Sequence, residues 1–130
     1  MILLDTDVCI EMLRGNRSVI DKRHEYDEEI ALSFMSAAEL FYGAEKSSQR
    51  KKNINLVEEL LITVEIIHTN IDVLKRFGEL KAALTQSGEI LPDADIFIAA
   101  TALTHCSMLV SGNVNHFRRI AELRIENWIR

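Results

Sequence analysis

Cysteine, proline and aromatic residues are scarce in this sequence of 130 residues. It contains two cysteines, one proline and one tryptophan, and aromatic residues make up only 6% of the chain. Cys9 and Cys106 lie far apart and form no Cys-x-x-Cys motif. This usage argues against a disulfide framework or a cysteine-ligated zinc finger. We therefore expect both thiols to be reduced, buried groups in a cytoplasmic protein.

Long apolar runs and an excess of positive charge are also missing. The longest apolar-rich stretch, Ile96–Leu103, falls well short of the roughly 20 residues that span a bilayer. No secretion signal opens the chain, so we expect neither export nor membrane association. The net charge of −5 argues against a general nucleic-acid coat protein. Basic clusters such as Lys46–Lys52 could still steer RNA to an enzyme whose acids gather elsewhere.

What the chain does contain is an alternation of short apolar strands and longer helical patterns. The length and the 48% hydrophobic content fit one domain spanning residues 1–130. We predict strands at residues 2–4, 30–34, 63–67, 108–110 and 123–128. We predict helices at residues 8–13, 17–29, 36–46, 54–61 and 74–84, with a further one after Pro92 that runs to Leu103. Residues 117–120 are predicted to form a short helix or a turn. This alternation indicates an α/β fold with three αβα layers and a small central parallel sheet flanked by helices.

The helix after Pro92 combines two acids with the most apolar run of the sequence. Asp93 and Asp95 precede a run of Ile, Phe, Ala and Leu that is apolar all round, which is typical of a buried helix. A carboxylate at the N-terminus of such a helix needs a compensating partner, because desolvating an ion costs on the order of several kcal/mol. We predict that the partner is a metal ion shared with acids from elsewhere in the chain.

Other polar residues are expected at the same edge of the sheet. Ligands of parallel sheets bind outside the carboxyl ends of the strands. There the pattern places Asp5, Glu39, Asp95 and the turn Ser111–Asn113. Four elements that are distant in the chain thus deliver polar groups to one place.

Each acid also has a purely structural interpretation. Asp5 or Asp7 could cap the first helix, and we assign that role to Asp7; Asp93 could cap the helix that contains Asp95. Ser36 and Glu39 are spaced as a capping box. Uncharged residues could fill these capping roles, however, and clustered carboxylates repel one another. A hard cation removes that repulsion, so we predict Mg²⁺, with Mn²⁺ as a possible substitute.

Patterns for other chemistries are absent. None of the four histidines, at positions 24, 68, 105 and 116, is spaced for zinc ligation or for a paired-histidine mechanism. No serine lies in a Gly-x-Ser-x-Gly motif, which argues against acyl transfer. A glycine-rich phosphate loop is missing as well.

Four segments carry short motifs in a fixed order: Leu4–Asp7, Ser36–Ser47, Asp93–Ala100 and Leu109–Phe117. Together these segments resemble the PIN-domain family, specifically the VapC-type toxins of bacterial toxin–antitoxin modules. They correspond to the family's Leu-Asp-Thr-Asn opening, its Glu-Leu-x-Tyr-Gly-Ala-Glu-Lys-Ser block, its Asp-x-x-Ile-Ala-Ala motif and its Leu-Val-Thr/Ser…Asn…Phe segment. Each motif is short, but their order and spacing together are specific and cover nearly the whole chain.

The resemblance implies a Mg²⁺-dependent endoribonuclease that is usually a homodimer and that a cognate VapB-type antitoxin inhibits. The RNA substrate in this family is transfer RNA or ribosomal RNA. By position, Asp5 and Asp95 are the implied metal ligands and Glu39 is the third catalytic acid. Ser111 and Asn113 fall where the family closes its site.

The chain departs from the family pattern at two places. Many PIN nucleases carry a fourth acid near Asn113, where this chain offers neutral oxygens. Asp7 replaces the usual asparagine, and Asp93 adds further charge, so both are candidate outer-shell ligands. Two other functions remain open at this stage: a PIN nuclease for RNA processing or DNA flaps, and a PIN-like module that only binds a partner.

Overall fold

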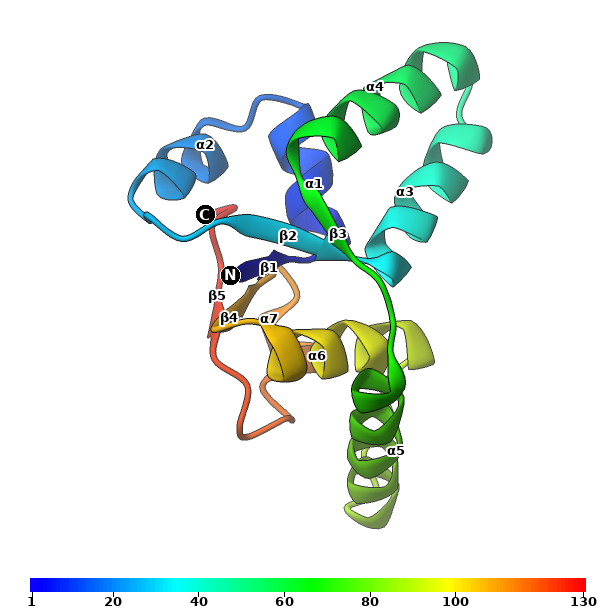
Figure 1. Ribbon diagram of the computed structural model, residues 1–130, viewed down its shortest axis with the longest axis vertical. Coiled ribbons are helices and arrows are strands. Elements are labelled where there is room, and N and C mark those ends of the chain that lie inside the picture. The colour runs from blue at the N-terminus through cyan, green and yellow to red at the C-terminus, as the bar shows by residue number, and fades with distance from the viewer.

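A sheet of five parallel strands lies between two layers of helices (Figure 1). The computed structural model describes all 130 residues. The strands are β1 (Ile2–Leu4), β2 (Ile30–Ser33), β3 (Glu65–Ile67), β4 (Met108–Val110) and β5 (Ile125–Glu126). Their order in the sheet is β3-β2-β1-β4-β5, and every neighbouring pair is parallel. The predicted α/β class with a central parallel sheet is confirmed.

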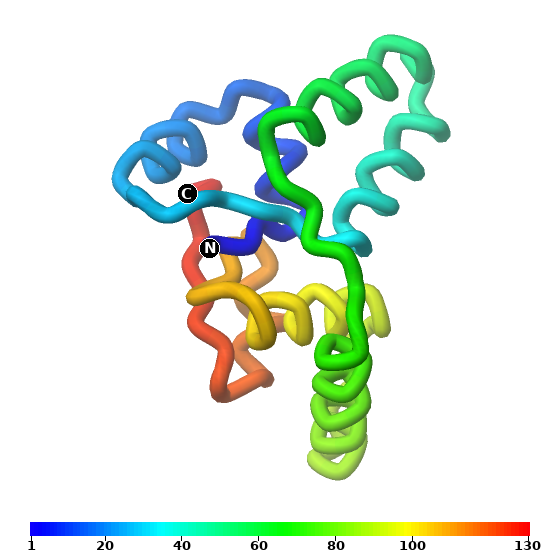
Figure 2. The backbone as a smooth tube through the Cα atoms, in the orientation of Figure 1, coloured from blue at the N-terminus to red at the C-terminus, as the bar shows by residue number.

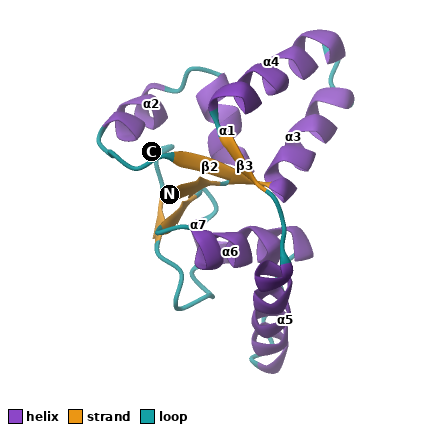
Figure 3. Cartoon of the chain, in the orientation of Figure 1, coloured by secondary structure: helices purple, strands orange, loops and turns teal.

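Seven helices cover the two faces of this sheet (Figure 3). They are α1 (Thr6–Leu13), α2 (Arg17–His24), α3 (Phe34–Glu45), α4 (Arg50–Thr63), α5 (Ile71–Gln86), α6 (Asp93–His105) and α7 (Val114–Phe117). Helices α1 to α4 pack on one face, and α5 to α7 pack on the other. Figure 2 shows the chain passing from the first layer to the second where β3 leads into α5. The expected three layers are therefore present.

The central strand β1 contributes to both cores, as its uninterrupted apolar sequence predicts. Ile2 and Leu4 face the core under α1 to α4, whereas Leu3 faces the core under α5 to α7. All three side chains are fully buried. A strand buried on both faces has no position for a polar side chain until it ends. The first polar residue after β1 is Asp5, which therefore emerges at the edge of the sheet.

Several predicted boundaries are wrong for local reasons. The second helix ends at His24 instead of residue 29, and the last strand is limited to Ile125–Glu126. The chain leaves the sheet after Glu126 because Trp128 is buried and stacks on Tyr26, with ring centroids 5.4 Å apart. Of the short helix or turn predicted at 117–120, the structure has the turn, at residues 118–119, and the short helix lies before it at Val114–Phe117.

The remaining helices match the predicted periodicity but extend further. Helix α4 runs from Arg50 to Thr63, and α5 from Ile71 to Gln86. Gly88, at φ +74°, follows the end of α5 in the left-handed conformation that commonly ends a helix. No helix of this structure combines the length and apolarity that crossing a membrane requires.

Candidate active site

Asp5 is the most buried acid of the chain. It follows β1 and is the N-cap of α1, where its Oδ1 accepts a hydrogen bond from the Thr6 amide at 2.8 Å. Its Oδ2 accepts one from the Ser111 hydroxyl at 2.7 Å. Burial raises the pKa of Asp5 to about 6; the bond from Ser111 opposes this rise, and the charges of Asp7 and Asp95 add to it. The carboxylate therefore lies in a site that lacks compensating positive charge.

Asp7 lies one residue into the first turn of α1 and does not cap it. The capping role predicted for Asp7 is wrong, because Asp5 already occupies the N-cap position. Asp7 Oδ2 instead accepts a hydrogen bond from the Gly112 amide at 2.9 Å. Its Oδ1 is buried and has no hydrogen-bond partner. Burial raises the pKa of Asp7, and Asp95 adds to that rise.

The turn Ser111–Asn113 closes one side of the site. Ser111 is fully buried, and its Oγ also accepts a hydrogen bond from the Asn113 amide at 2.9 Å. Gly112 lies so close to α1 that an added Cβ would stand 2.7 Å from Asp7 Oδ2 and 2.8 Å from Ile129 Cδ1. Only glycine fits this close approach without movement of its neighbours.

Asp95 reaches the site from the first turn of α6. Pro92 is the N-cap of this helix and provides no side-chain bond, so the alternative role of Asp93 as cap is wrong. Asp95 Oδ2 lies 3.1 Å from Nδ1 of His116, and the same ring nitrogen lies 2.9 Å from Nδ2 of Asn113. His116 was missed by the sequence analysis. Its only signal was its position three residues after Asn113, in a segment already expected at this edge.

Glu39 is joined to the site through Thr6, a residue that the sequence analysis did not single out. Thr6 Oγ1 donates a hydrogen bond to Glu39 Oε1 at 2.7 Å and lies 3.0 Å from Ser36 Oγ. The predicted capping box is wrong: Ser33 caps α3 by accepting from the Ser36 amide, and Ser36 is buried inside the helix. Because Glu39 has no capping bond to make, its carboxylate turns toward α1.

Asp93 is oriented differently from the other acids. Its carboxylate forms an ion pair with Lys81 of α5 at 3.0 Å, and both side chains are more than half exposed. The structure therefore brings Asp5, Asp7, Asp95, Ser111 and Asn113 together, and it connects Glu39 to them through Thr6. Asp93 lies apart from this group and pairs with Lys81 of α5.

The donor chemistry of this site fits a hard divalent ion. The charges of Asp7 and Asp95 add to the raised pKa of Asp5, and the charge of Asp95 adds to the raised pKa of Asp7. No lysine or arginine forms an ion pair with any of these three acids. The unpartnered Oδ1 of Asp7 adds a buried oxygen that lacks a donor. As they stand, no three acid, histidine or cysteine side chains are close enough together to hold an ion. Mg²⁺ commonly takes one or two carboxylates and completes its shell with water.

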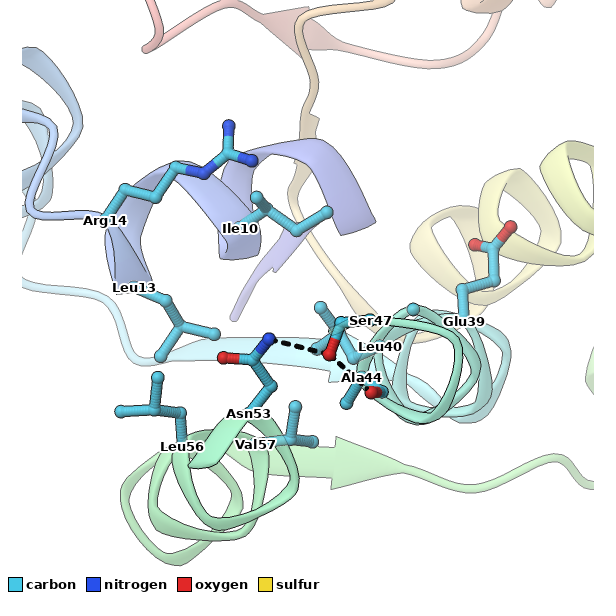
Figure 4. Close-up of a pocket in the computed structure, with 11 residues that line it drawn as sticks. Ile10, Leu13, Arg14, Glu39, Leu40, Ala44, Ser47, Asn53, Leu56 and Val57 are labelled. Atoms are coloured by element: carbon cyan, nitrogen blue, oxygen red, sulfur yellow. Dashed lines mark hydrogen bonds between the residues drawn. The ribbon is translucent and has the colours of Figure 1, made fainter. Parts of the chain in front are cut away.

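An apolar groove lies beside the site, between α1, α3 and α4 (Figure 4). Its cavity volume is about 320 Å³. Leucines 13, 40 and 56 line it together with Ile10 and Val57. Arg14 and Glu39 are its two charged residues, so Glu39 belongs both to the groove and to the chain of contacts that reaches Asp5.

Comparisons with known proteins identify the family of this chain. The PIN-domain family model matches residues 2–123. Ribonuclease VapC2 of Haemophilus influenzae is 34% identical over 128 residues, which cover 98% of this chain and 97% of that protein. The tRNA(fMet)-specific endonuclease VapC of Shigella flexneri is 26% identical, with 97% and 96% of the two chains covered.

A solved structure of a VapC relative has the same fold as this chain. In the crystal structure of VapBC2 from Rickettsia felis bound to a DNA fragment from their promoter, a chain superposes with a TM-score of 0.92. That chain is 32% identical to this one, and the match covers 98% of this chain and 99% of that one. The chain therefore belongs to the PIN-domain family and, within it, to the VapC group.

Proposed function

We propose that this protein is a Mg²⁺-dependent endoribonuclease and the toxin of a type II toxin–antitoxin pair. The observation that carries the proposal is the meeting of Asp5, Asp7 and Asp95, at the starts of two helices distant in the chain, without a lysine or arginine that forms an ion pair with them. The ribonuclease and endonuclease names of the VapC relatives support RNA as the substrate.

The roles of the acids follow from their positions. Asp5 and Asp95 would hold the ion, and Glu39 would act with them as the third acid. When bound, Mg²⁺ supplies a Lewis acid that lowers the pKa of a water and neutralises charge on the scissile phosphate. Mn²⁺ accepts the same oxygen ligands and could replace it.

Neighbouring residues position these acids. Ser111 fixes the orientation of the Asp5 carboxylate, and Asp7 fixes the turn that presents Ser111 and Asn113. Thr6 directs Glu39 toward the mouth of the site. Asp7, Ser111 and Asn113 therefore remain candidates for outer-shell contacts, whereas Asp93 is held by Lys81.

We infer that hydrolysis leaves a 5′-phosphate on the product. Water is the proposed nucleophile, and no pair of histidines lies at the site to activate a ribose 2′-hydroxyl. A 2′,3′-cyclic phosphate at the cleaved end would contradict this mechanism. The RNA target is proposed to be transfer or ribosomal RNA, in line with the tRNA(fMet)-specific relative.

The groove provides a place for the proposed VapB-type antitoxin. An apolar groove of about 320 Å³ accepts the apolar side chains of a short partner segment, and Arg14 would attract an acidic residue of that segment. Because Glu39 belongs to the groove and to the site, a bound partner would lie against the catalytic acids. The solved relatives include VapBC complexes, which supports this partner. We propose that the toxin itself is a homodimer.

The test compares RNA cleavage by the wild type and by Asp5→Asn, with and without Mg²⁺. We expect cleavage only by the wild type with Mg²⁺, and an unchanged fold in the variant. Asp21→Asn on the exposed surface of α2 serves as the matched control and should cleave normally. Equal cleavage by Asp5→Asn, or full activity in a chelator, would overturn the proposal.

A further inference from the structure

His116 is delivered to the site by a very short helix. Helix α7 follows the turn Ser111–Asn113 directly, and it is anchored by Phe117, which is fully buried in the core under α5 to α7. This anchor leaves the preceding side chain, His116, facing Asp95 with 40% of its side chain exposed. Solvent ions can therefore reach the ring.

One ring nitrogen of His116 faces two polar groups. Nδ1 of His116 lies 2.9 Å from the side-chain amide of Asn113 and 3.1 Å from Oδ2 of Asp95. A protonated Nδ1 donates to Asp95, and the Asn113 amide can turn its oxygen toward the same proton. An unprotonated Nδ1 instead directs its lone pair toward the Asp95 carboxylate, and a cation bound by both atoms would then hold them together.

The spacing of the two atoms suits such an ion. Adjacent ligands of an octahedral ion, each about 2.1 Å from it, lie about 3 Å apart. The 3.1 Å between His116 Nδ1 and Asp95 Oδ2 matches that separation. Asp95 is also the acid through which α6 contributes to the proposed metal site. The histidine therefore offers a nitrogen donor next to an expected ligand.

We propose that His116 is a nitrogen ligand of the divalent-ion site and that it biases the site toward Mn²⁺ over Mg²⁺. This inference rests on the proposed function, because it concerns the ion that the acids bind. Mg²⁺ is a hard ion that takes oxygen ligands and keeps its waters, whereas affinity for mixed nitrogen and oxygen sites rises through the transition metals from Mn²⁺ onward. An imidazole in the ligand set therefore favours Mn²⁺.

The test measures ion binding, not only cleavage. Mn²⁺ binding to the wild type, His116→Asp and His116→Ala is followed by the electron paramagnetic resonance signal of the free ion, and Mg²⁺ binding is measured by competition. We expect the preference for Mn²⁺ over Mg²⁺ to fall about tenfold in both variants. His116→Asp should also bind Mg²⁺ more tightly than the wild type does, because its ligand set consists of oxygens alone.

His105→Asp is the matched control. His105 also contacts an asparagine, with its Nε2 3.2 Å from Asn70 Nδ2, but it lies at the far end of α6 from Asp95. It should leave the preference unchanged. In the wild type, bound Mn²⁺ should broaden the ring resonances of His116 and not those of His105. Melting temperatures close to that of the wild type confirm that each variant folds.

Two results would overturn the inference. One is an unchanged ion preference in both His116 variants, and the other is a His116 ring that Mn²⁺ leaves unbroadened. Either result would leave His116 as a simple hydrogen-bond partner of Asp95. The proposed function would still stand in that case if Asp5→Asn abolished Mg²⁺-dependent cleavage, so the two failures are distinguishable.

Discussion

The hydroxyl of Ser111 donates a hydrogen bond to Oδ2 of Asp5 over 2.7 Å, although the two residues are 106 positions apart in the chain. Both residues are buried. They follow two neighbouring parallel strands, β1 and β4, which end at the same edge of the sheet. The bond therefore ties the first acid of the site to the turn that closes it.

Ser111→Ala should destabilise the protein by about 1–3 kcal/mol, because it leaves a buried carboxylate oxygen without its donor. Urea unfolding at pH 7 measures this loss. Ser107→Ala is the control: Ser107 donates to Glu28 at 2.8 Å, but that pair is exposed, and we expect a loss below about 1 kcal/mol. Equal losses of unfolding free energy in the two variants would show that burial of the Ser111–Asp5 bond does not increase its contribution to stability.

The free energy of unfolding should depend on pH through the titration of Asp5. Its pKa is about 6 in the folded protein and close to 3.8 in the unfolded chain, so the folded state binds the proton more tightly. The stabilisation is complete below pH 3.8 and is lost as pH rises through 6, with a change on the order of 2–3 kcal/mol. Asp7, whose pKa is also raised, acts in the same direction.

Asp5→Asn should therefore be more stable than the wild type at pH 7 in the absence of metal. The gain should shrink toward pH 4, where the wild-type carboxyl is protonated. Asparagine keeps an oxygen for the Thr6 amide, so the cap of α1 survives. Thermal unfolding in a chelator between pH 4 and 7 measures the difference. A variant that is less stable at every pH would contradict the conclusion that burial destabilises the charged form of Asp5.

Thr6→Val should reduce cleavage and lower stability by about 1–2 kcal/mol, because it removes an exposed bond to Glu39 and a part-buried bond to the Ser36 hydroxyl. The expected cause is loss of orientation of the Glu39 carboxylate. Single-turnover cleavage rates and urea unfolding separate the two effects. Thr85→Val, which removes an exposed hydroxyl bond in α5, should cleave at the wild-type rate.

Gly112→Ala should destabilise the protein by about 1–3 kcal/mol, because the new methyl group meets Asp7 and Ile129 at less than 3 Å. It should also slow cleavage by moving the turn that contains Ser111. Gly78→Ala makes the same change inside α5, where nothing lies within 4 Å of the new Cβ. That control should gain about 1 kcal/mol from helix propensity. A neutral Gly112→Ala would exclude the close approach.

Leu56→Lys should weaken antitoxin binding at least about tenfold, because it places a charge in the apolar groove. Ile62→Lys makes the same change on α4 at a residue that is 84% exposed and outside the groove. It should bind as the wild type does. Titration calorimetry with the proposed VapB-type antitoxin measures both affinities, and equal binding by Leu56→Lys would place the partner elsewhere.

The sequence by itself determined the class of fold and the approximate location of the site. Uncharged strands such as Ile2–Leu4 must be buried on both faces, and a buried strand can present a polar side chain only where it ends. Asp5 and Ser111 follow such strands directly, so their meeting at one edge could be predicted from the alternation of strands and helices. The run after Asp95 fixed a buried helix for the same reason.

Only the tertiary structure decided how each polar group is used. A hydrogen bond depends on distances of a few tenths of an ångström between elements that the chain separates widely, and no local pattern encodes those distances. The structure thus gave the cap of α1 to Asp5 instead of Asp7 and freed Glu39 to bond Thr6. It also placed His116 against Asp95. The sequence determines that the acids gather at one edge, because burial follows a periodic pattern along the chain. Packing decides which group each acid bonds, because hydrogen-bond partners follow no such pattern.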